Sequence, residues 1–165
     1  ITNLTAATLT INATGNLIVD GLTSAELSGV SGLLTLTATD DVIFQTAASS
    51  HNGAVTVKAD DDIEVKVDVT AGGNFTATAD NDSSGAGNFT VDSGATVTSS
   101  SGNISITAFE IVENGTLTAS ISGSVTRTET KPVTSTTTTA EEAEIDQGTN
   151  STFVQDFTSP TESGC

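Results

Sequence analysis

The amino-acid sequence predicts an almost all-β protein folded as a parallel β-helix, or β-solenoid, with about 20 residues per coil. Three observations predict this fold class. A short segment recurs along the chain, its copies alternate apolar with hydroxyl side chains, and shorter strand-like segments follow them. Several strand segments at a nearly fixed period describe the successive turns of a solenoid. The copies are 32-GLLTLTATDD-41, 53-GAVTVKADDD-62, 73-GNFTATADND-82 and 102-GNISITAFEI-111.

The first strand of each coil is predicted from the alternation that follows a glycine in every copy. These glycines are 21, 20 and 29 residues apart, and each supplies the corner before a strand. Side chains two residues apart lie on one face of a strand, so the apolar set faces the core and the polar set faces solvent. The glycines are Gly32, Gly53, Gly73 and Gly102. The inward set is Leu34/Leu36, Val55/Val57, Phe75/Ala77 and Ile104/Ile106, and the outward set is Thr35/Thr37, Thr56/Lys58, Thr76/Thr78 and Ser105/Thr107.

Two further strands are predicted in the coils. The longest spacing between glycines leaves extra residues, which are expected to form an outward loop at residues 80–87. Residues 8–22 are expected to form a degenerate coil that precedes the first full copy. The second strand is expected at residues 42–44, 63–67, 89–91 and 117–119, and the third at residues 46–48, 69–71 and 95–98.

The composition favours strands over helices. Ser and Thr together contribute 51 residues, and Val, Ile, Leu and Thr dominate the strand-like segments. β-Branched side chains pack well on a pleated surface, and no window has the apolar spacing of an amphipathic helix. The alternative fold is a β-sandwich of short strands, which would not require the same residues to recur at nearly constant spacing.

Two regions are predicted. Residues 1–126 are expected to form the solenoid, and residues 127–165 a Thr-rich acidic tail that holds both prolines. This composition is typical of a disordered linker. Phe153 and Phe157 are unusual in a linker, so the alternative is that they dock this segment on its own solenoid or on a neighbouring subunit. Cys165 is the single cysteine, so it either pairs with another chain or has no structural role.

The net charge of −17 restricts the partners of the protein. Four basic residues are too few to neutralise the phosphate backbone of a nucleic acid, so we expect no binding to nucleic acid. Anionic membrane surfaces are disfavoured for the same reason, and the chain has no apolar run of about 18 residues for membrane insertion. A strongly acidic surface does suit divalent cations.

Acidic residues gather at the corner that follows the first strand of three coils. Equivalent residues of neighbouring coils lie about 4.8 Å apart, so these carboxylates repel one another unless a cation lies between them. Carboxylate oxygens are suitable ligands for Ca²⁺, so the corner is a candidate calcium site. The alternative is a solvated turn, because Asp is common in turns. The candidate ligands are Asp40, Asp41, Asp61, Asp62 and Asp82.

Other features give weaker indications. The outward Thr-x-Thr columns resemble the ice-binding faces of some antifreeze proteins, although Lys58 and Ser105 interrupt them. The alternative is that Thr provides a soluble strand surface. Eight of the ten Asn residues lie in Asn-x-Ser/Thr sequons. These sequons either are glycosylation sites or arise because the strand-forming repeat itself has the pattern Gly-Asn-apolar-Thr. An enzyme is not expected, because the only histidine, His51, is placed in a turn without a nucleophile beside it.

The amino-acid sequences of the coils resemble those of a known group of proteins. The stretches are GLLTLTATDDVIF, GAVTVKADDDIEV and GNFTATADNDSSGAGNFTVDSGATVTSSSGNISITA. They resemble the repeats of very large secreted bacterial proteins, the filamentous-haemagglutinin-type adhesins and related β-strand-repeat surface proteins. The resemblance covers roughly residues 15–125. It implies an extracellular, right-handed parallel β-helix that serves as a stalk, an adhesin or a filament.

The predicted function follows from the ends of the solenoid. Open ends expose unpaired strand edges, and the sequence shows no cap for either of them. We therefore expect a non-enzymatic extracellular or cell-surface structural protein whose subunits stack into a filament. The alternative is a stalk or adhesin module of a larger secreted protein, with a glycan or a host-surface molecule as its ligand. Copies of the same chain are the expected partners, and calcium is the one candidate cofactor.

Overall fold

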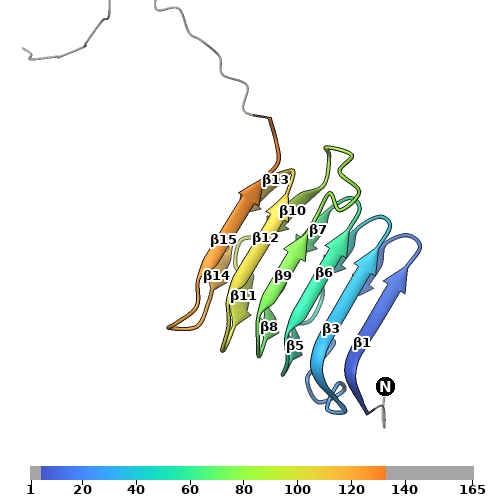
Figure 1. The fold of residues 1–165 in the computed structure, drawn as a ribbon, viewed down its shortest axis with the longest axis vertical. Coiled ribbons are helices and arrows are strands. Elements are labelled where there is room, and N and C mark those ends of the chain that lie inside the picture. Colours follow the sequence, from blue (N-terminus) through green and yellow to red (C-terminus); the bar gives the residue numbers. More distant parts are fainter. Residues whose placement is uncertain (1–4, 133–165) are drawn as a thin grey trace, which may run out of the picture. The chain divides into compact units, whose positions relative to one another are not determined.

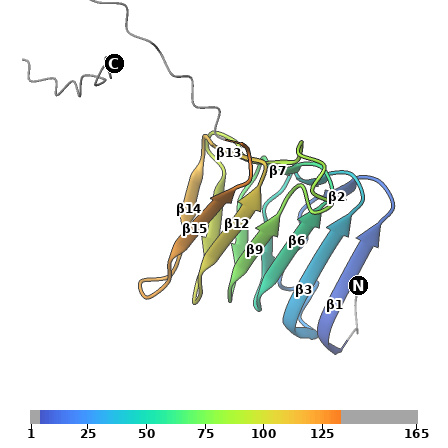
Figure 2. The ribbon, with the colours of Figure 1, turned by 45° about the horizontal axis from the view of Figure 1, so that its top comes forward.

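The structure is a computed structural model, and it describes residues 5–132. These residues form a three-sided parallel β-solenoid of about six turns, with about 22 residues per turn (Figures 1 and 2). The predicted fold class is confirmed. A β-sandwich is excluded, because every strand pair among the described residues is parallel. The same residues contain no helix, and so no helical segment that could cross a membrane.

A full turn has three strands, one on each of three sides that we call side A, side B and side C. The six strands of side A lie next to one another in Figure 1, in the order in which they follow along the chain. They are β1 (Ala6–Ala13), β3 (Val30–Ala38), β6 (Val55–Ala59), β9 (Phe75–Thr78), β12 (Ile104–Ala108) and β15 (Val125–Glu129). Side B consists of β2 (Leu17–Val19), β4 (Val42–Phe44), β7 (Ile63–Val65), β10 (Asn88–Val91) and β13 (Glu110–Glu113). Side C consists of β5 (Ser49–His51), β8 (Val69–Ala71), β11 (Thr96–Ser99) and β14 (Thr116–Thr118).

Equivalent side chains of successive turns lie in columns, as the sequence predicted. On side A, Leu34 pairs with Val55, Val55 with Phe75, and Phe75 with Ile104. All four side chains are buried. The predicted neighbouring column is also in register and buried, and it consists of Leu36, Val57, Ala77 and Ile106. Each pair of turns therefore shares the same inward face along side A.

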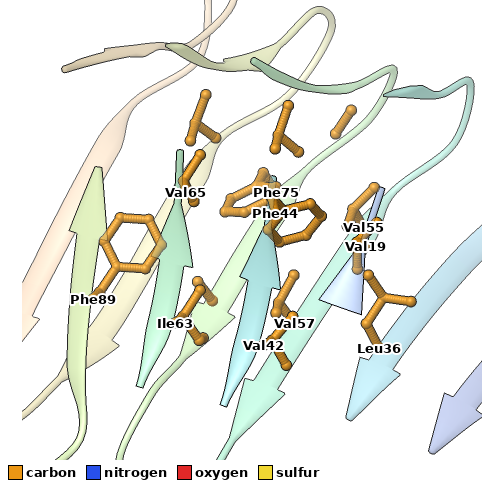
Figure 3. Close-up of a cluster of buried hydrophobic side chains, with 14 of the residues drawn as sticks. Val19, Leu36, Val42, Phe44, Val55, Val57, Ile63, Val65, Phe75 and Phe89 are labelled. Atoms are coloured by element: carbon orange, nitrogen blue, oxygen red, sulfur yellow. The ribbon is translucent and has the colours of Figure 1, made fainter. Parts of the chain in front are cut away.

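Apolar side chains from all three sides fill the interior of the solenoid. Phe75 on side A and Phe44 and Phe89 on side B are almost completely buried, and Figure 3 shows these rings among the aliphatic side chains of the core. Burial of one such side chain contributes about 1.5–3 kcal/mol relative to its exposure to water. The stacked apolar columns are therefore the main stabilising feature of the fold.

Two of the strands predicted from the sequence lie elsewhere. The third strand of the coil that begins at Gly32 is β5 and not residues 46–48, because Thr46 has a positive φ of 65° and bends the chain there. Residues 117–119 were predicted as a second strand, but β14 belongs to side C. The second strand of that coil is β13, which follows β12 after the single residue Phe109. This coil lacks the acidic corner that separates the strands in the other copies.

The first turn has no strand on side C. Residues 20–29 instead form turns beside the edge of β5, where the Ser50 amide donates a hydrogen bond to the Leu22 carbonyl at 2.8 Å. Reciprocal hydrogen bonds hold these turns together. The Thr23 amide donates to Glu26 Oε2 at 2.9 Å, and the Glu26 amide donates to Thr23 Oγ1 at 3.3 Å. The edge of β5 is therefore covered by backbone from the first turn.

The solenoid continues past residue 126, where the sequence analysis places its end. β15 pairs with β12 as far as Glu129, and the compact unit extends to Pro132. The rest of the predicted tail lies outside the described residues, as do the predicted docking residues Phe153 and Phe157 and the terminal Cys165. The roles suggested for these three residues stay predictions.

Candidate functional site

The acidic corner lies where the chain passes from side A to side B. Three of the five predicted ligands meet there, because carboxylate oxygens of Asp41, Asp61 and Asp62 lie within 4.8 Å of one another. Asp41 and Asp62 are half-buried and Asp61 is exposed. The stacking of turns produces this cluster, since Asp41 and Asp62 directly precede the paired strands β4 and β7.

The other two predicted ligands lie at the margin of this cluster. Asp40 is exposed, and its backbone carbonyl accepts a hydrogen bond from the Asp61 amide at 3.3 Å. Asp82 is exposed in the predicted outward loop, where its Oδ1 accepts a hydrogen bond from the Ser84 amide at 3.1 Å. Neither carboxylate belongs to the group of three that approach within ligand distance of a common centre.

The corner is also a ladder of hydrogen bonds between turns. The Asp41 amide donates to Asn16 Oδ1 at 3.3 Å, and the Asp62 amide donates to Asp41 Oδ1 at 3.1 Å. The Asn88 amide then donates to Asp62 Oδ1 at 2.7 Å. The side chains of Asn16, Asp41 and Asp62 thus each satisfy a backbone N–H of the next turn, at a corner where the sheet ladder is interrupted. We call these four residues the Asx ladder.

The negative charges of the corner affect the ionisation of Asp61. Partial desolvation raises the pKa of the Asp61 carboxyl above its ordinary value of 3.8. The charges of Asp62 and Asp41, and then of Asp40 and Asp82, raise the same pKa further. The corner therefore holds negative charge at a cost in free energy, which a cation or a proton would reduce.

The arrangement is compatible with a calcium ion. Two ligands on one Ca²⁺ lie at most about 5 Å apart, because each Ca–O distance is about 2.3–2.6 Å. The carboxylate oxygens of Asp41, Asp61 and Asp62 meet this limit. Asp41 and Asp62 each use Oδ1 as an acceptor for a backbone amide, which leaves their second oxygens for an ion. These residues can therefore supply part of a calcium coordination sphere, and water would have to supply the rest.

A second ladder of the same kind runs along the corner between side C and side A. The Asn103 amide donates to Asn74 Oδ1 at 2.9 Å, and the Ser124 amide donates to Asn103 Oδ1 at 2.8 Å. Sequence reasoning missed the structural role of these side chains. The signal was present, because an Asn or a Ser directly precedes the side A strands β9, β12 and β15. For two of the eight sequon residues, Asn74 and Asn103, this ladder gives a structural reason for an Asn at that position of the coil.

The outward side chains of side A form a column of hydroxyl groups in register. Six residues of six successive turns take part, and neighbouring strands of a sheet are about 4.8 Å apart. A second column beside it is mixed, since Asn12 and Lys58 occupy two of its positions. The hydroxyl column consists of Thr10, Thr35, Thr56, Thr76, Ser105 and Thr126.

The sequence analysis placed His51 in a turn, but this residue lies in a strand. It is the last residue of β5, only 3% exposed, and its Nε2 lies 2.8 Å from the carbonyl oxygen of Gly32. The placement of β5 three residues later than predicted turns this side chain into the core. His51 therefore connects side C with the strand that begins side A of its own coil.

The C-terminal end of the solenoid carries charged groups where other turns have apolar ones. Arg127 follows Ile106 in its inward column, and Glu129 follows Ala108. Arg127 Nη2 donates to Glu113 Oε2 of β13 at 2.8 Å, and this contact raises the pKa of the guanidinium. The sequence analysis recognised no cap, but inward charges of this kind are a known protection of a sheet edge against further pairing.

A second contact closes the same end between sides A and B. The Ile111 amide, on the free edge of β13, donates to Glu129 Oε1 at 2.9 Å. Lys131 Nζ lies 3.0 Å from Glu110 Oε2 and adds an ion pair between the last turn and β13. Side-chain groups of the last turn thus reach a strand edge that has no further strand beside it.

Comparison with known proteins does not assign the chain to a family. No protein family, no curated protein and no solved structure matches it.

Proposed function

We propose that the protein is a non-enzymatic structural module, a stiff spacer within an extracellular or cell-surface protein. One observation carries this proposal: the inward apolar columns of side A continue from β1 to β12, and the hydrogen bonds of the Asx ladder continue from Asn16 to Asn88. Each turn contacts mainly its neighbours, so the structure extends along one axis and its length is set by the number of turns.

Stiffness follows from the way in which the turns are joined. Each turn contributes strands to the sheets of its neighbours, and the corners are joined by side-chain hydrogen bonds of the Asx ladder. Five strand spacings separate β1 from β15 along side A, which corresponds to about 24 Å. Bending the solenoid would break several of these contacts together. A spacer needs this property, whereas a catalyst needs a cleft with converging reactive groups.

Deletion of one turn tests the proposal. Residues 53–72 form one period, and their removal joins Asn52 to Gly73, so that Leu34 meets Phe75 in place of Val55. A spacer should remain folded after this deletion and shorten by about 4.8 Å, the width of one strand. Circular dichroism and small-angle X-ray scattering measure both properties. Loss of cooperative unfolding in this variant would contradict a modular rod.

The proposed location has a separate test. Antibodies raised against the purified solenoid should label intact cells of the source organism. Labelling that requires permeabilised cells would contradict a surface location. This result would not affect the spacer proposal, which the deletion experiment tests. The acidic and hydroxyl-rich surface supports solubility outside the cell, and the resemblance to secreted repeat proteins points in the same direction.

A filament made by stacking solenoids head to tail receives less support. Such stacking in register would place the inward Arg127 and Glu129 of one copy against Ile11 and Ala13 of the next, because these residues continue the same two inward columns at the other end of side A. Burial of charged groups against apolar side chains without new partners is unfavourable. Negative-stain electron microscopy of concentrated protein tests this alternative, and fibres with the strand repeat along their axis would support it.

Calcium binding at the acidic corner is a second candidate function. The close approach of Asp41, Asp61 and Asp62 favours it, because a bound cation would relieve their mutual repulsion. In a spacer, such an ion would join adjacent turns, since Asp41 belongs to one turn and the other two carboxylates to the next. Ice binding has weaker support, because Asn12 and Lys58 break the second outward column, and a thermal-hysteresis measurement tests it.

A further inference from the structure

We propose that His51 makes the solenoid sensitive to mild acid. Uptake of a proton by its imidazole places an unpaired positive charge in the core, and the turn that contains β5 loses stability. This inference concerns the fold itself, so it goes beyond the spacer function and does not depend on it.

The first argument is the position of the imidazole. His51 is a buried residue of β5, and it lines a small cavity together with Leu34 and Val69. Its Nε2 lies 2.8 Å from the carbonyl oxygen of Gly32, which can only accept a hydrogen bond. Nε2 therefore carries the proton of the neutral imidazole, and Nδ1 carries the lone pair.

The second argument is the surroundings of Nδ1. This atom is buried and has no hydrogen-bond partner among the described residues. A proton added there would create a second N–H donor and a positive charge, and no described group is placed to accept that hydrogen bond. Burial of a charge without a partner carries a large cost in free energy. Protonation of the folded chain at His51 is therefore unfavourable.

The third argument is the distribution of charged groups around β5. Because Nε2 contacts Gly32 and Nδ1 has no partner, no described carboxylate is bonded to the ring, although the whole chain has a net charge of −17. The cavity that His51 lines also has no charged side chain in its wall. The charged groups on or next to the elements that pack against β5 are Asp20, Glu26, Lys58 and Asp68, and all four are exposed.

The direction of the effect follows from the difference in proton binding between the two states. The unfolded chain exposes the imidazole to water, where such a group takes up a proton below about pH 6.5. Wherever the unfolded state binds more protons than the folded state, stability falls as the pH falls. His51 is the only histidine of the chain, so no other imidazole contributes in this range. Mild acid should therefore destabilise the solenoid through this one side chain.

The contacts of β5 define the region where this effect is largest. The Ser50 amide donates to the Leu22 carbonyl at 2.8 Å, and the Leu22 amide donates to Ser49 Oγ at 3.2 Å. These bonds join the first turn to one edge of β5, and the other edge pairs with β8. Displacement of His51 would loosen the contacts on both edges.

Urea denaturation at two pH values tests the role of His51. The variant is His51→Gln, whose side-chain amide stays neutral and can still donate to the Gly32 carbonyl. Between about pH 7.5 and about pH 5.5, the unfolding constant of the unmodified chain should increase relative to that of the variant by up to about tenfold. Both chains have the same carboxylates, so the titration of these groups cancels in the ratio. An equal response of the two chains would overturn the proposal.

The matched control restores a histidine at the surface. Ser122→His in the His51→Gln chain adds an imidazole at an exposed position far from β5 in the sequence. Its response to acid should match that of His51→Gln and not that of the unmodified chain. Recovery of the full acid response through an exposed imidazole would overturn the proposal, because burial would then not be the cause.

Hydrogen exchange of the unmodified chain provides a measurement that needs no substitution. The Ser50 amide reports on β5, and the Ile104 amide, which donates to the Ser124 carbonyl at 2.9 Å, reports on a strand three positions further along side A than β3. Between about pH 7.5 and about pH 5.5, the protection factor of the Ser50 amide should decrease more than that of the Ile104 amide. A decrease at Ser50 no larger than that at Ile104 would overturn the proposal.

Discussion

Asp41 and Asp62 belong to neighbouring turns of the solenoid, and the side chain of one holds the backbone of the other. Asp41 Oδ1 accepts a hydrogen bond from the Asp62 amide at 3.1 Å, and Asp62 Oδ1 accepts one from the Asn88 amide at 2.7 Å. An acidic side chain at this corner therefore has a structural role whether or not a cation binds. The side-chain oxygens of the corner act as hydrogen-bond acceptors, and the carboxylates also carry negative charge. These two properties lead to separate predictions.

Loss of the Asp62 side chain should destabilise the solenoid through its hydrogen bond. Asp62→Ala leaves the partly buried Asn88 amide without its acceptor, which costs about 1–2 kcal/mol in the free energy of unfolding. Asp62→Asn keeps a side-chain oxygen at the same position and removes only the charge. Urea denaturation of the two variants should show a clear loss for Ala and none for Asn. Equal losses would mean that charge, and not the acceptor, is the important property.

Removal of the Asp61 charge should stabilise the protein near neutral pH. The folded state raises the pKa of Asp61 above its ordinary value of 3.8, so the ionised carboxylate is less favourable in the folded than in the unfolded chain. Asp61→Asn removes this penalty. The control is Asp20→Asn, which removes one negative charge as well, but at a residue outside the acidic corner. Asp61→Asn should raise the melting temperature at about pH 7 more than this control does.

The pH dependence of this effect has a defined sign. For a carboxyl whose pKa is raised on folding, the penalty is fully present above the folded pKa. It disappears as the pH falls through the folded pKa toward the unfolded value of 3.8, where both states become protonated. The advantage of Asp61→Asn should therefore shrink between about pH 7 and about pH 3.5. An advantage that grows on acidification would contradict the assigned direction of the shift.

Calcium should raise the melting temperature of the unmodified chain more than that of the Asp61→Asn variant. A ligand that binds the folded state alone increases stability with its concentration, and Asp61 is one of the three carboxylates that approach a common centre. Millimolar CaCl₂ should raise the melting temperature, and EDTA should reverse the change. The Asp20→Asn variant should keep the full response. A melting curve that neither calcium nor EDTA moves would exclude a calcium site at the corner.

Gly53 should tolerate no side chain. A Cβ atom built at Gly53 would lie 1.8 Å from the carbonyl oxygen of Gly32 in the preceding turn. Gly53→Ala should therefore cost about 2–4 kcal/mol, because the backbones of two turns would have to separate. Gly15 is the matched control, since a Cβ there meets nothing within 4 Å. Gly15→Ala should change the stability by less than about 0.5 kcal/mol. A similar midpoint of urea denaturation for both variants would refute the close packing of turns.

The sequence was sufficient to predict the side A columns and the outward loop. Leu34, Val55, Phe75 and Ile104 could be aligned because strands with one buried face repeat their apolar residues with a period of two. The glycines at the start of each copy were also found, but the sequence analysis explained them only as corners before a strand. The glycine at position 53 is needed because a neighbouring backbone approaches closely, and it lies outside the positive-φ region that Gly21, Gly85 and Gly94 occupy.

The rest depended on long-range contacts that local patterns do not contain. The position of β5 was missed because residues 46–48 and residues 49–51 are both short segments without a large aliphatic side chain, and only pairing with β8 selects the second. The charged end was missed because no local pattern shows that the exposed Arg127 and Glu129 continue the inward columns of Ile106 and Ala108, and only the register of β15 with β12 does so. Of the five candidate calcium ligands, the same stacking of turns brings the carboxylate oxygens of three within 4.8 Å of one another.

Distances between spin labels on side A test the central claim most directly. Cysteines for labelling replace Thr126 and, in separate variants of the Cys165→Ser chain, Thr10 or Thr35, with unlabelled protein in excess to dilute contacts between copies. The Thr10–Thr126 pair spans five strand spacings and the Thr35–Thr126 pair four, so the mean distances should differ by about 4.8 Å, near 24 and 19 Å between backbones. Narrow distributions with this difference are expected of a stiff, in-register solenoid. Broad distributions, or a difference unrelated to one strand spacing, would contradict it.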